Sequence, residues 1–124
     1  MNYSATLDFL YSSLPMYQRI GKAAYKSSLD TTLSLDNHLG KPHRSFKSIH
    51  IAGTNGKGSV SHMLAAVLQD AGYKTGLYTS PHYIDFRERI RVDGKMVDEQ
   101  YVIDFVRENR DIIMELEASF FEMT

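Results

Sequence analysis

The sequence predicts an α/β fold built around a parallel central sheet. Residues 48–52 form a short apolar run, residues 53–59 a glycine-rich turn, residues 60–71 an amphipathic helical pattern and residues 74–79 a second strand. Strand, turn, helix and strand in this order form a βαβ unit, whose two strands are parallel and whose crossover is right-handed. The first strand carries the apolar residues Ile49, Ile51 and Ala52, and we expect it to be buried on both faces.

The composition describes a small globular protein. The chain has 124 residues, 43% of them hydrophobic and 23% charged, with a formal net charge of −1. This balanced charge does not indicate a nucleic-acid partner, and the absence of cysteine excludes disulfides and cysteine-based metal sites. The N-terminus lacks the pattern of a signal peptide, and no apolar run reaches the roughly 20 residues of a membrane helix. We therefore expect a cytoplasmic protein without a membrane partner.

Helices are expected before the sheet. Residues 3–14 carry apolar side chains at helical spacing, with Ser4 as a possible N-cap and Pro15 as the stop. A leucine-bearing segment at residues 29–39 predicts another helix, which ends before Gly40. Residues 16–28, between the two, give only a weak pattern.

The remaining elements follow the first strand. The helix after the glycine-rich turn ends at Gly72, and its apolar stripe comprises Val60, Met63, Leu64, Val67, Leu68 and Ala71. An irregular loop opens at Pro81, and the Asp93-Gly94 pair predicts the turn of a hairpin. Asp98 is expected to cap a long helix with one apolar face, formed by Val102, Phe105, Val106, Ile112, Ile113 and Leu116.

The turn "GTNGKGS", residues 53–59, predicts a phosphate-binding loop, although it departs from the strict nucleotide-loop spacing. That spacing requires a glycine where Ile51 stands and a hydroxyl where Gly58 stands. The loop nevertheless lies between a strand and a helix, where unpaired N–H groups and the helix dipole favour an anion. Glycines allow close approach of phosphate oxygens, Lys57 supplies a compact positive charge, and Ser59 supplies a hydroxyl for a phosphate oxygen or a magnesium ion. The alternative is an ordinary strand-to-helix turn.

Three motifs in order, "GTNGKGS", "YTSPHYIDFRERIRVDG" and "FFE", resemble the folylpolyglutamate synthase/dihydrofolate synthase family of ATP-dependent ligases, relatives of the Mur peptidoglycan ligases. The resemblance extends over essentially the whole chain. It implies that residues 1–124 are the N-terminal portion of a Mur-ligase-like P-loop ATPase domain, with a glutamate-binding C-terminal domain absent from this chain. It also implies that ATP phosphorylates a carboxylate of dihydropteroate or a reduced folate, and that L-glutamate then attacks the acyl phosphate.

The resemblance also implies the site residues. Ser80 corresponds to a magnesium ligand, and Lys57 is the implied catalytic residue. His82, Phe86, Glu88 and Arg89 are assigned to loop shape or substrate approach, and Tyr83 departs from the aliphatic residue more usual in the family. The implied ATP contacts are Thr54, Asn55, Gly56, Lys57, Gly58 and Ser59, and the implied pterin contacts are Ser119, Phe120, Phe121 and Glu122. Without the family, Ser80-Pro81 would be a strand-ending turn and the two phenylalanines would be core residues.

Three other functions remain open at this stage. A Mur-type peptidoglycan peptide ligase shares the first motif, a P-loop kinase or GTPase requires a different loop spacing, and a non-catalytic nucleotide-binding module requires the loop alone. We expect the full-length protein to be a monomer. The 124-residue chain is expected to be inactive alone and to self-associate through a sheet edge and the apolar face at residues 102–116.

Overall fold

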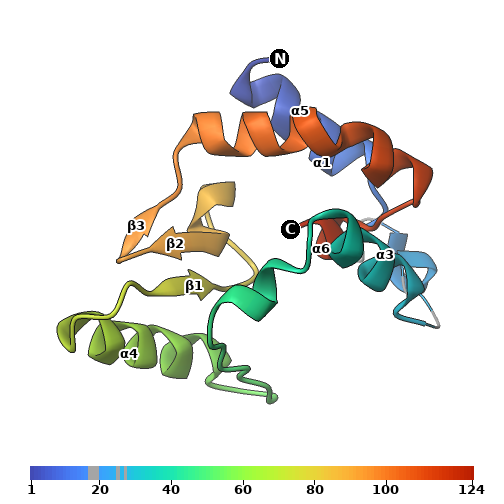
Figure 1. The fold of residues 1–124 in the computed structure, drawn as a ribbon. Coiled ribbons are helices and arrows are strands. Elements are labelled where there is room, and N and C mark those ends of the chain that lie inside the picture. The colour runs from blue at the N-terminus through green and yellow to red at the C-terminus, as the bar shows by residue number, and fades with distance from the viewer. Residues whose placement is uncertain (17–19, 25, 27) are drawn as a thin grey trace. The chain divides into compact units, whose positions relative to one another are not determined.

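The computed structural model describes residues 1–16, 20–24, 26 and 28–124 (Figure 1). Part of the stretch with a weak pattern, namely residues 17–19, 25 and 27, lies outside the described residues. The chain forms two compact units, one made of Met1–Ser48 with Val102–Thr124 and the other of Ile49–Tyr101. Each unit is described by itself.

The first unit is helical. Its core contains Leu10, Leu14, Val106 and Ile113, each at most 1% exposed. Helices α1 and α5 are in contact, since the Arg110 guanidinium lies 4.7 Å from the centre of the Phe9 ring. The elements are α1 (Tyr3–Ser13), the 3-10 turns η1 (Gly21–Ala24) and η2 (Pro42–Ser45), α3 (Asp30–His38), α6 (Phe120–Met123) and most of α5 (Glu99–Glu115).

The predicted helices of this unit are confirmed, with two corrections. Asn2 caps α1 in place of Ser4, and its side-chain oxygen accepts the N–H of Ala5 at 2.8 Å. The apolar face of α5 is packed inside the unit, with Val102 and Val106 buried. The expectation that this face is unpaired was therefore wrong, whereas self-association of the chain stays a prediction.

The second unit combines one helix with a small sheet. Its elements are α4 (Lys57–Asp70), β1 (Gly76–Tyr78), the 3-10 turn η3 (Phe86–Arg89), β2 (Ile90–Val92) and β3 (Lys95–Met96). The strand order is β1-β2-β3, and both pairs are antiparallel. The predicted hairpin is confirmed, with left-handed φ of 49° at Asp93 and 78° at Gly94, as a type I′ turn requires. Helix α4 lies beside β1 (Figure 1).

The C-terminus of α4 ends as the sequence predicts. Gly72 has a left-handed φ of 91°. Its N–H donates to the carbonyl of Gln69 at 2.9 Å, and the next N–H, of Tyr73, donates to the carbonyl of Leu68 at 3.0 Å. This pair of bonds is a Schellman motif, which satisfies carbonyls that the end of a helix would otherwise leave unpaired.

The parallel sheet is not present in the part of the chain that the structure describes. Residues 48–52 form no strand, and Ile49 is 65% exposed, so the predicted burial on both faces was wrong for this chain. The stripe of α4 is exposed too, with Met63 and Val67 each at 65%. A strand forms only when its backbone hydrogen-bonds to a neighbouring strand. In the described residues β1 pairs with β2, and no strand pairs with residues 48–52.

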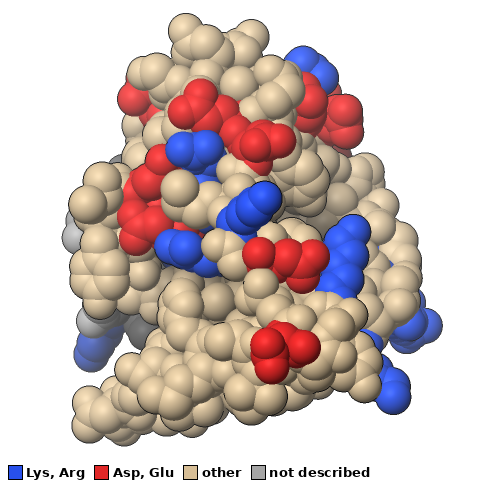
Figure 2. All heavy atoms as spheres, turned by 90° about the vertical axis from the view of Figure 1, so that its left-hand side faces the viewer, with Lys and Arg blue, Asp and Glu red and all other residues tan. Residues whose placement is uncertain are grey.

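On the face shown in Figure 2, acidic and basic side chains are interspersed and do not gather into one basic patch. Among the described residues, no helix combines the length and the apolar character needed to cross a bilayer.

Candidate nucleotide and substrate sites

The predicted phosphate loop has the backbone conformation that its glycines allow. Gly53 has φ of 154° and Gly56 has φ of 78°, both in the region that side chains with a Cβ rarely adopt. Gly56 is the N-cap of α4, and the helix begins at Lys57. The loop therefore turns directly into the helix, as the sequence predicts.

Gly58 is the most informative residue of the loop. It lies in the first turn of α4 without a positive φ, so the backbone does not require glycine there. A Cβ at this position would meet no other described atom within 4 Å, so packing does not require glycine either. A helix interior loses stability with glycine relative to alanine, so neither local structure nor packing explains why position 58 is glycine.

The N-terminus of α4 offers donors and positive charge. Within the described residues, no side chain caps it, and its first turn holds no acidic residue. The first N–H groups of a helix have no intrahelical partner, and the helix dipole adds a partial positive charge. The Lys57 ammonium folds over the loop, donating to the carbonyls of Gly53 at 2.5 Å and Thr54 at 3.4 Å. Exposed donors beside an ammonium form a site that suits a phosphate.

Ser80 lies in the same unit, just beyond the end of β1. It is exposed and precedes a cis bond to Pro81. Its hydroxyl is a hard oxygen of the kind magnesium accepts, and magnesium is often held by one or two protein oxygens together with substrate phosphates. A magnesium role for Ser80 therefore stays a prediction. Among the described residues, no three His, Cys, Asp or Glu side chains gather into a metal cluster.

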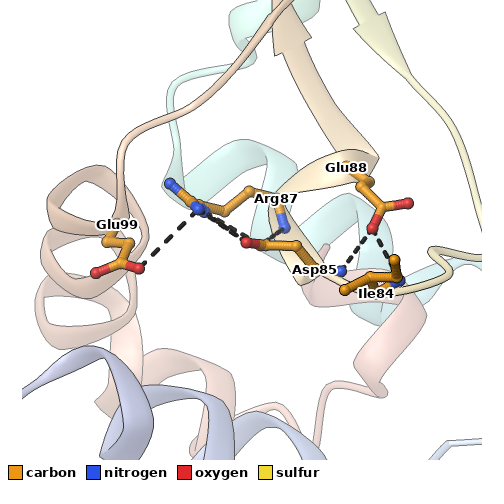
Figure 3. A network of polar contacts seen from close by, with 5 residues as sticks. All are labelled: Ile84, Asp85, Arg87, Glu88 and Glu99. Atoms are coloured by element: carbon orange, nitrogen blue, oxygen red, sulfur yellow. Dashed lines mark hydrogen bonds and ion pairs between the residues drawn. The ribbon is translucent and has the colours of Figure 1, made fainter.

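The loop that follows Ser80 is held by its own side chains (Figure 3). The Glu88 carboxylate accepts the N–H groups of Tyr83, Ile84 and Asp85 at 3.1, 2.8 and 2.5 Å. Because these backbone donors favour the charged form, they hold the pKa of Glu88 below its ordinary value. Asp85 and Glu88 together form a capping box around η3.

Arg87 extends this network. Its guanidinium pairs with the Asp85 carboxylate at 2.8 Å and approaches Glu99, at the start of α5, to 4.0 Å. Glu88 was predicted to serve loop shape or substrate approach, and no role was predicted for Asp85 or Arg87. An Asp three residues before a Glu is the spacing of a capping box, and that signal could have identified Asp85.

Arg89 and His82 form a second contact in the loop. Arg89 is only 4% exposed, and its Nε donates to Nδ1 of His82 at 2.8 Å. Burial, followed by the nearby charge of Arg89, lowers the pKa of His82. The proton of the neutral ring is therefore on Nε2, since Nδ1 accepts a hydrogen bond. Both residues shape the loop, which is one of the two roles predicted for them; a role in substrate approach stays a prediction.

The predicted pterin segment, residues 119–122, lies in the first unit and forms the start of α6. The hydroxyl of Ser119 accepts the N–H of Glu122 at 3.2 Å, and the Glu122 carboxylate accepts the N–H of Ser119 at 2.9 Å. This reciprocal pair is a capping box. Two residues assigned to substrate thus also shape the helix.

The two aromatic residues of the segment have different environments. Phe120 is 3% exposed and stacks on Tyr11, with ring centres 5.6 Å apart. Phe121 is 68% exposed. The core interpretation is therefore confirmed for Phe120, whereas Phe121 leaves a ring available for a ligand.

Glu122 also binds Lys26, which the sequence analysis missed. The Lys26 ammonium lies 2.8 Å from Oε2 of Glu122, and Oε1 accepts a longer bond of 3.4 Å from Thr32. Burial raises the pKa of Glu122, but the hydrogen bonds from Lys26 and Ser119 outweigh it, and the pKa is lowered overall. The carboxylate is therefore charged at neutral pH.

An open depression of about 340 Å³ lies elsewhere in the second unit, lined by Gln69, Gly72, Tyr73, Lys74 and Asp93. It is at the C-terminal end of α4, about 20 Å from the N-terminus at the usual rise per residue. It is therefore separate from the predicted phosphate loop.

A glycine loop that opens a helix, with a lysine in its first turn, is the arrangement found at the phosphate sites of α/β proteins that bind nucleotides. No family model matches the chain. The folylpolyglutamate synthase of Lacticaseibacillus casei is 33% identical over 123 residues, which cover 97% of this chain and 27% of that protein. The solved folylpolyglutamate synthetase of Lactobacillus casei superposes with a TM-score of 0.84 at 31% identity, over 99% of this chain and 31% of that one.

A second solved structure, the folylpolyglutamate synthase of Thermotoga maritima, gives a TM-score of 0.82 at 37% identity over 97% of this chain and 27% of that one. The relationship predicted from the motifs is confirmed: the chain corresponds to the N-terminal portion of the folylpolyglutamate synthase/dihydrofolate synthase family. It spans less than a third of the length of these relatives.

Proposed function

We propose that the full-length protein is an ATP-dependent ligase that joins L-glutamate to dihydropteroate, to reduced folates, or to both. ATP would phosphorylate the acceptor carboxylate, and the glutamate amine would displace phosphate from the acyl phosphate. A carboxylate is a poor electrophile until one oxygen becomes a good leaving group, so phosphorylation supplies the activation.

The proposal that the loop binds ATP rests on one observation: neither the backbone conformation nor the packing of residue 58 requires a glycine there. A β- or γ-phosphate beside Gly58 would meet the first N–H groups of α4 and the Lys57 ammonium. We assign ATP binding to Thr54, Asn55, Gly56, Lys57, Gly58 and Ser59. Solved relatives in complex with AMPPCP and folate, and with ADP and AMPPCP, support a nucleotide as the ligand.

Charge neutralisation is the main chemical task of this site, because phosphoryl transfer concentrates negative charge on the transferred group. Lys57 would leave its loop carbonyls for the terminal phosphates. Ser80 would contribute its hydroxyl to a magnesium ion, which would shield the phosphate oxygens.

The acceptor part rests on the segment at residues 119–122. The exposed ring of Phe121 suits stacking on a flat pterin. Glu122 retains acceptor capacity at Oε1, where Thr32 makes only a 3.4 Å bond, and would orient a pterin N–H. Ser119 and Phe120 would hold the segment in place.

The rest of the enzyme would lie in further chain. We propose that residues 1–124 belong to the ATPase domain, that residues 48–52 and β1 become neighbours in its parallel sheet, and that another domain binds glutamate. The exposed apolar residues of α4 and Ile49 support this, since a completed sheet would cover them. The full-length protein would be a cytoplasmic monomer.

The test is amide synthesis by the full-length protein. With ATP, magnesium, radiolabelled glutamate and dihydropteroate or tetrahydrofolate, we expect one ADP and one phosphate released per amide formed. Product formed only with a UDP-linked muropeptide would instead identify a peptidoglycan ligase. Nucleotide binding without product from either acceptor would identify a non-catalytic module.

A further inference from the structure

We infer that Lys26 is a positioning residue for residues 119–122, the segment proposed to bind the pterin substrate. Its ammonium connects the turn before α6 and the Glu122 carboxylate to the N-terminal part of the chain. These contacts would fix the orientation of Phe121 before the substrate binds. This inference rests on the proposed function. It assigns a role to a residue outside the three family motifs.

The Lys26 ammonium contacts three acceptors. Nζ donates to the backbone carbonyl of Glu117 at 2.7 Å and to the hydroxyl of Thr31 at 3.2 Å, and it lies 2.8 Å from the Glu122 carboxylate. A lysine ammonium has three donors, so these acceptors account for all of them. Two of the acceptors lie more than 90 residues along the chain, and the lysine therefore joins distant segments.

The turn at Glu117, whose carbonyl accepts a hydrogen bond from Lys26, has a strained backbone. Glu117 has a left-handed φ of 51°, a conformation that costs energy for a residue with a Cβ. Its N–H donates to the Met114 carbonyl and the N–H of Ala118 donates to the Ile113 carbonyl, at 3.1 and 3.0 Å. These bonds form a Schellman motif at the end of α5 in which glutamate takes the place usually held by glycine.

Helix α6 is also too short to be stable without contacts to the rest of its unit. It has four residues, fewer than an isolated helix needs. Its fixed points are the buried Phe120, the buried Met123 and the carboxylate of Glu122, which is 11% exposed. Phe121 lies between these fixed points, so the direction of its exposed ring depends on them. Lys26 supplies the charged partner that keeps Glu122 in the capping box.

The test uses Lys26→Met, which keeps an unbranched apolar stem and removes the charge, with Lys22→Met of η1 as the matched control. In the 124-residue chain, carbon-detected NMR follows the titration of the Glu122 carboxyl. We expect its pKa to rise in Lys26→Met and to stay unchanged in Lys22→Met. An unchanged pKa in Lys26→Met would overturn the inference.

In the full-length enzyme, Lys26→Met should raise the KM for the pterin substrate on the order of 10- to 100-fold, the scale of lost positioning, and leave the KM for ATP within about twofold. Lys26→Arg, which keeps the charge, should recover part of the loss and guards against a variant that fails to fold. Equal changes in both KM values would show a general structural role and overturn the inference. If the wild-type enzyme made no glutamate amide, the proposed function would fail, and the Glu122 titration would still decide whether Lys26 fixes this segment.

Discussion

The two segments predicted to bind ligands differ in how many of their polar groups already make hydrogen bonds or ion pairs within the protein. At residues 53–59 the loop is exposed, and no described side chain caps the helix it opens. At residues 119–122 the side chains of Ser119 and Glu122 bind each other's backbone, and Lys26 binds Glu122. The first segment keeps its backbone donors for a ligand, whereas the second uses most of its polar groups to hold a short helix.

This difference indicates two ways of building a binding site. An anion needs unpaired donors and open space, and glycines supply both without side chains. A flat ring needs a rigid aromatic surface at a fixed angle, and in the proposed pterin site the residues around Phe121 would immobilise it. Substitutions in the first segment should therefore weaken binding with little loss of stability. In the second segment, some substitutions should lower stability and others should weaken binding.

The largest expected effect is at Lys57. Lys57→Ala should abolish ATP-dependent amide formation in the full-length protein, because it removes the ammonium that would neutralise the terminal phosphates. A charge-assisted contact contributes about 1.5–3 kcal/mol to binding, and more where the transition state depends on it. Lys74→Ala, beyond the far end of α4, is the control. Wild-type turnover by Lys57→Ala at saturating ATP would remove the lysine from the site.

The two phenylalanines should respond in opposite ways. Phe120→Ala should lower the free energy of unfolding by about 3–5 kcal/mol, as expected for a buried aromatic residue. Phe121→Ala should leave stability nearly unchanged and weaken binding of the pterin substrate by about 0.5–1.5 kcal/mol, the contribution of an aromatic pair. Denaturant unfolding and substrate titration measure the two quantities. Equal losses of stability would remove the distinction between the rings.

Gly58→Ala should separate stability from nucleotide binding in the first segment. We expect the free energy of unfolding to rise by about 0.5–1 kcal/mol, because alanine is the better helix residue. ATP affinity should fall by about tenfold, because the new methyl group occupies the phosphate space. Gly76→Ala is matched to it, since a Cβ there also meets no described atom within 4 Å. Unchanged ATP affinity in Gly58→Ala would contradict the account of this glycine.

Ser80→Ala should raise the magnesium concentration needed for half-maximal activity, with a smaller change in folate binding. The substitution removes one hard oxygen ligand and no pterin contact. Activity measured against magnesium at fixed ATP, with folate affinity measured separately, tests this. If the magnesium dependence stayed as in the wild type, Ser80 would have no part in the metal site.

The smallest effect concerns the loop after Ser80. The pKa of Glu88 is lowered from an ordinary 4.5 by backbone donors, so its contribution to stability is present above that value and is lost as the pH falls through the folded pKa. Glu88→Gln should therefore melt below the wild type at pH 7, and the gap should close once the pH is below the folded pKa. Glu108→Gln, on α5, controls for the loss of one charge. A gap that persisted in acid would exclude ionisation of Glu88 as its cause.

The sequence predicted what depends on neighbours along the chain. Helices α1, α3, α4 and α5, the stop at Gly72 and the hairpin at Asp93-Gly94 are all set by spacing, caps and turn residues, so local patterns identify them. The N-cap of α1 was placed at Ser4 although Asn2 holds it, because asparagine and serine are both favoured N-cap residues.

The sequence did not predict what depends on distant partners. The strand expected at residues 48–52 requires another strand's backbone, and the pattern could not show that the described chain offers none. The contact between Lys26 and Glu122 joins residues 96 positions apart, so no spacing rule identifies it. Glu122 was assigned to substrate from its motif, and its structural bonds became visible only in three dimensions.

The most direct test of the phosphate site is a titration of the 15N-labelled 124-residue chain with AMPPCP, with adenosine as the control. We predict saturable shifts of the backbone amide signals of Lys57, Gly58 and Ser59 with AMPPCP and none with adenosine, because the phosphates and not the base bind the start of α4. AMPPCP that left these three amides unmoved while shifting others, or adenosine that moved them equally, would contradict the phosphate loop.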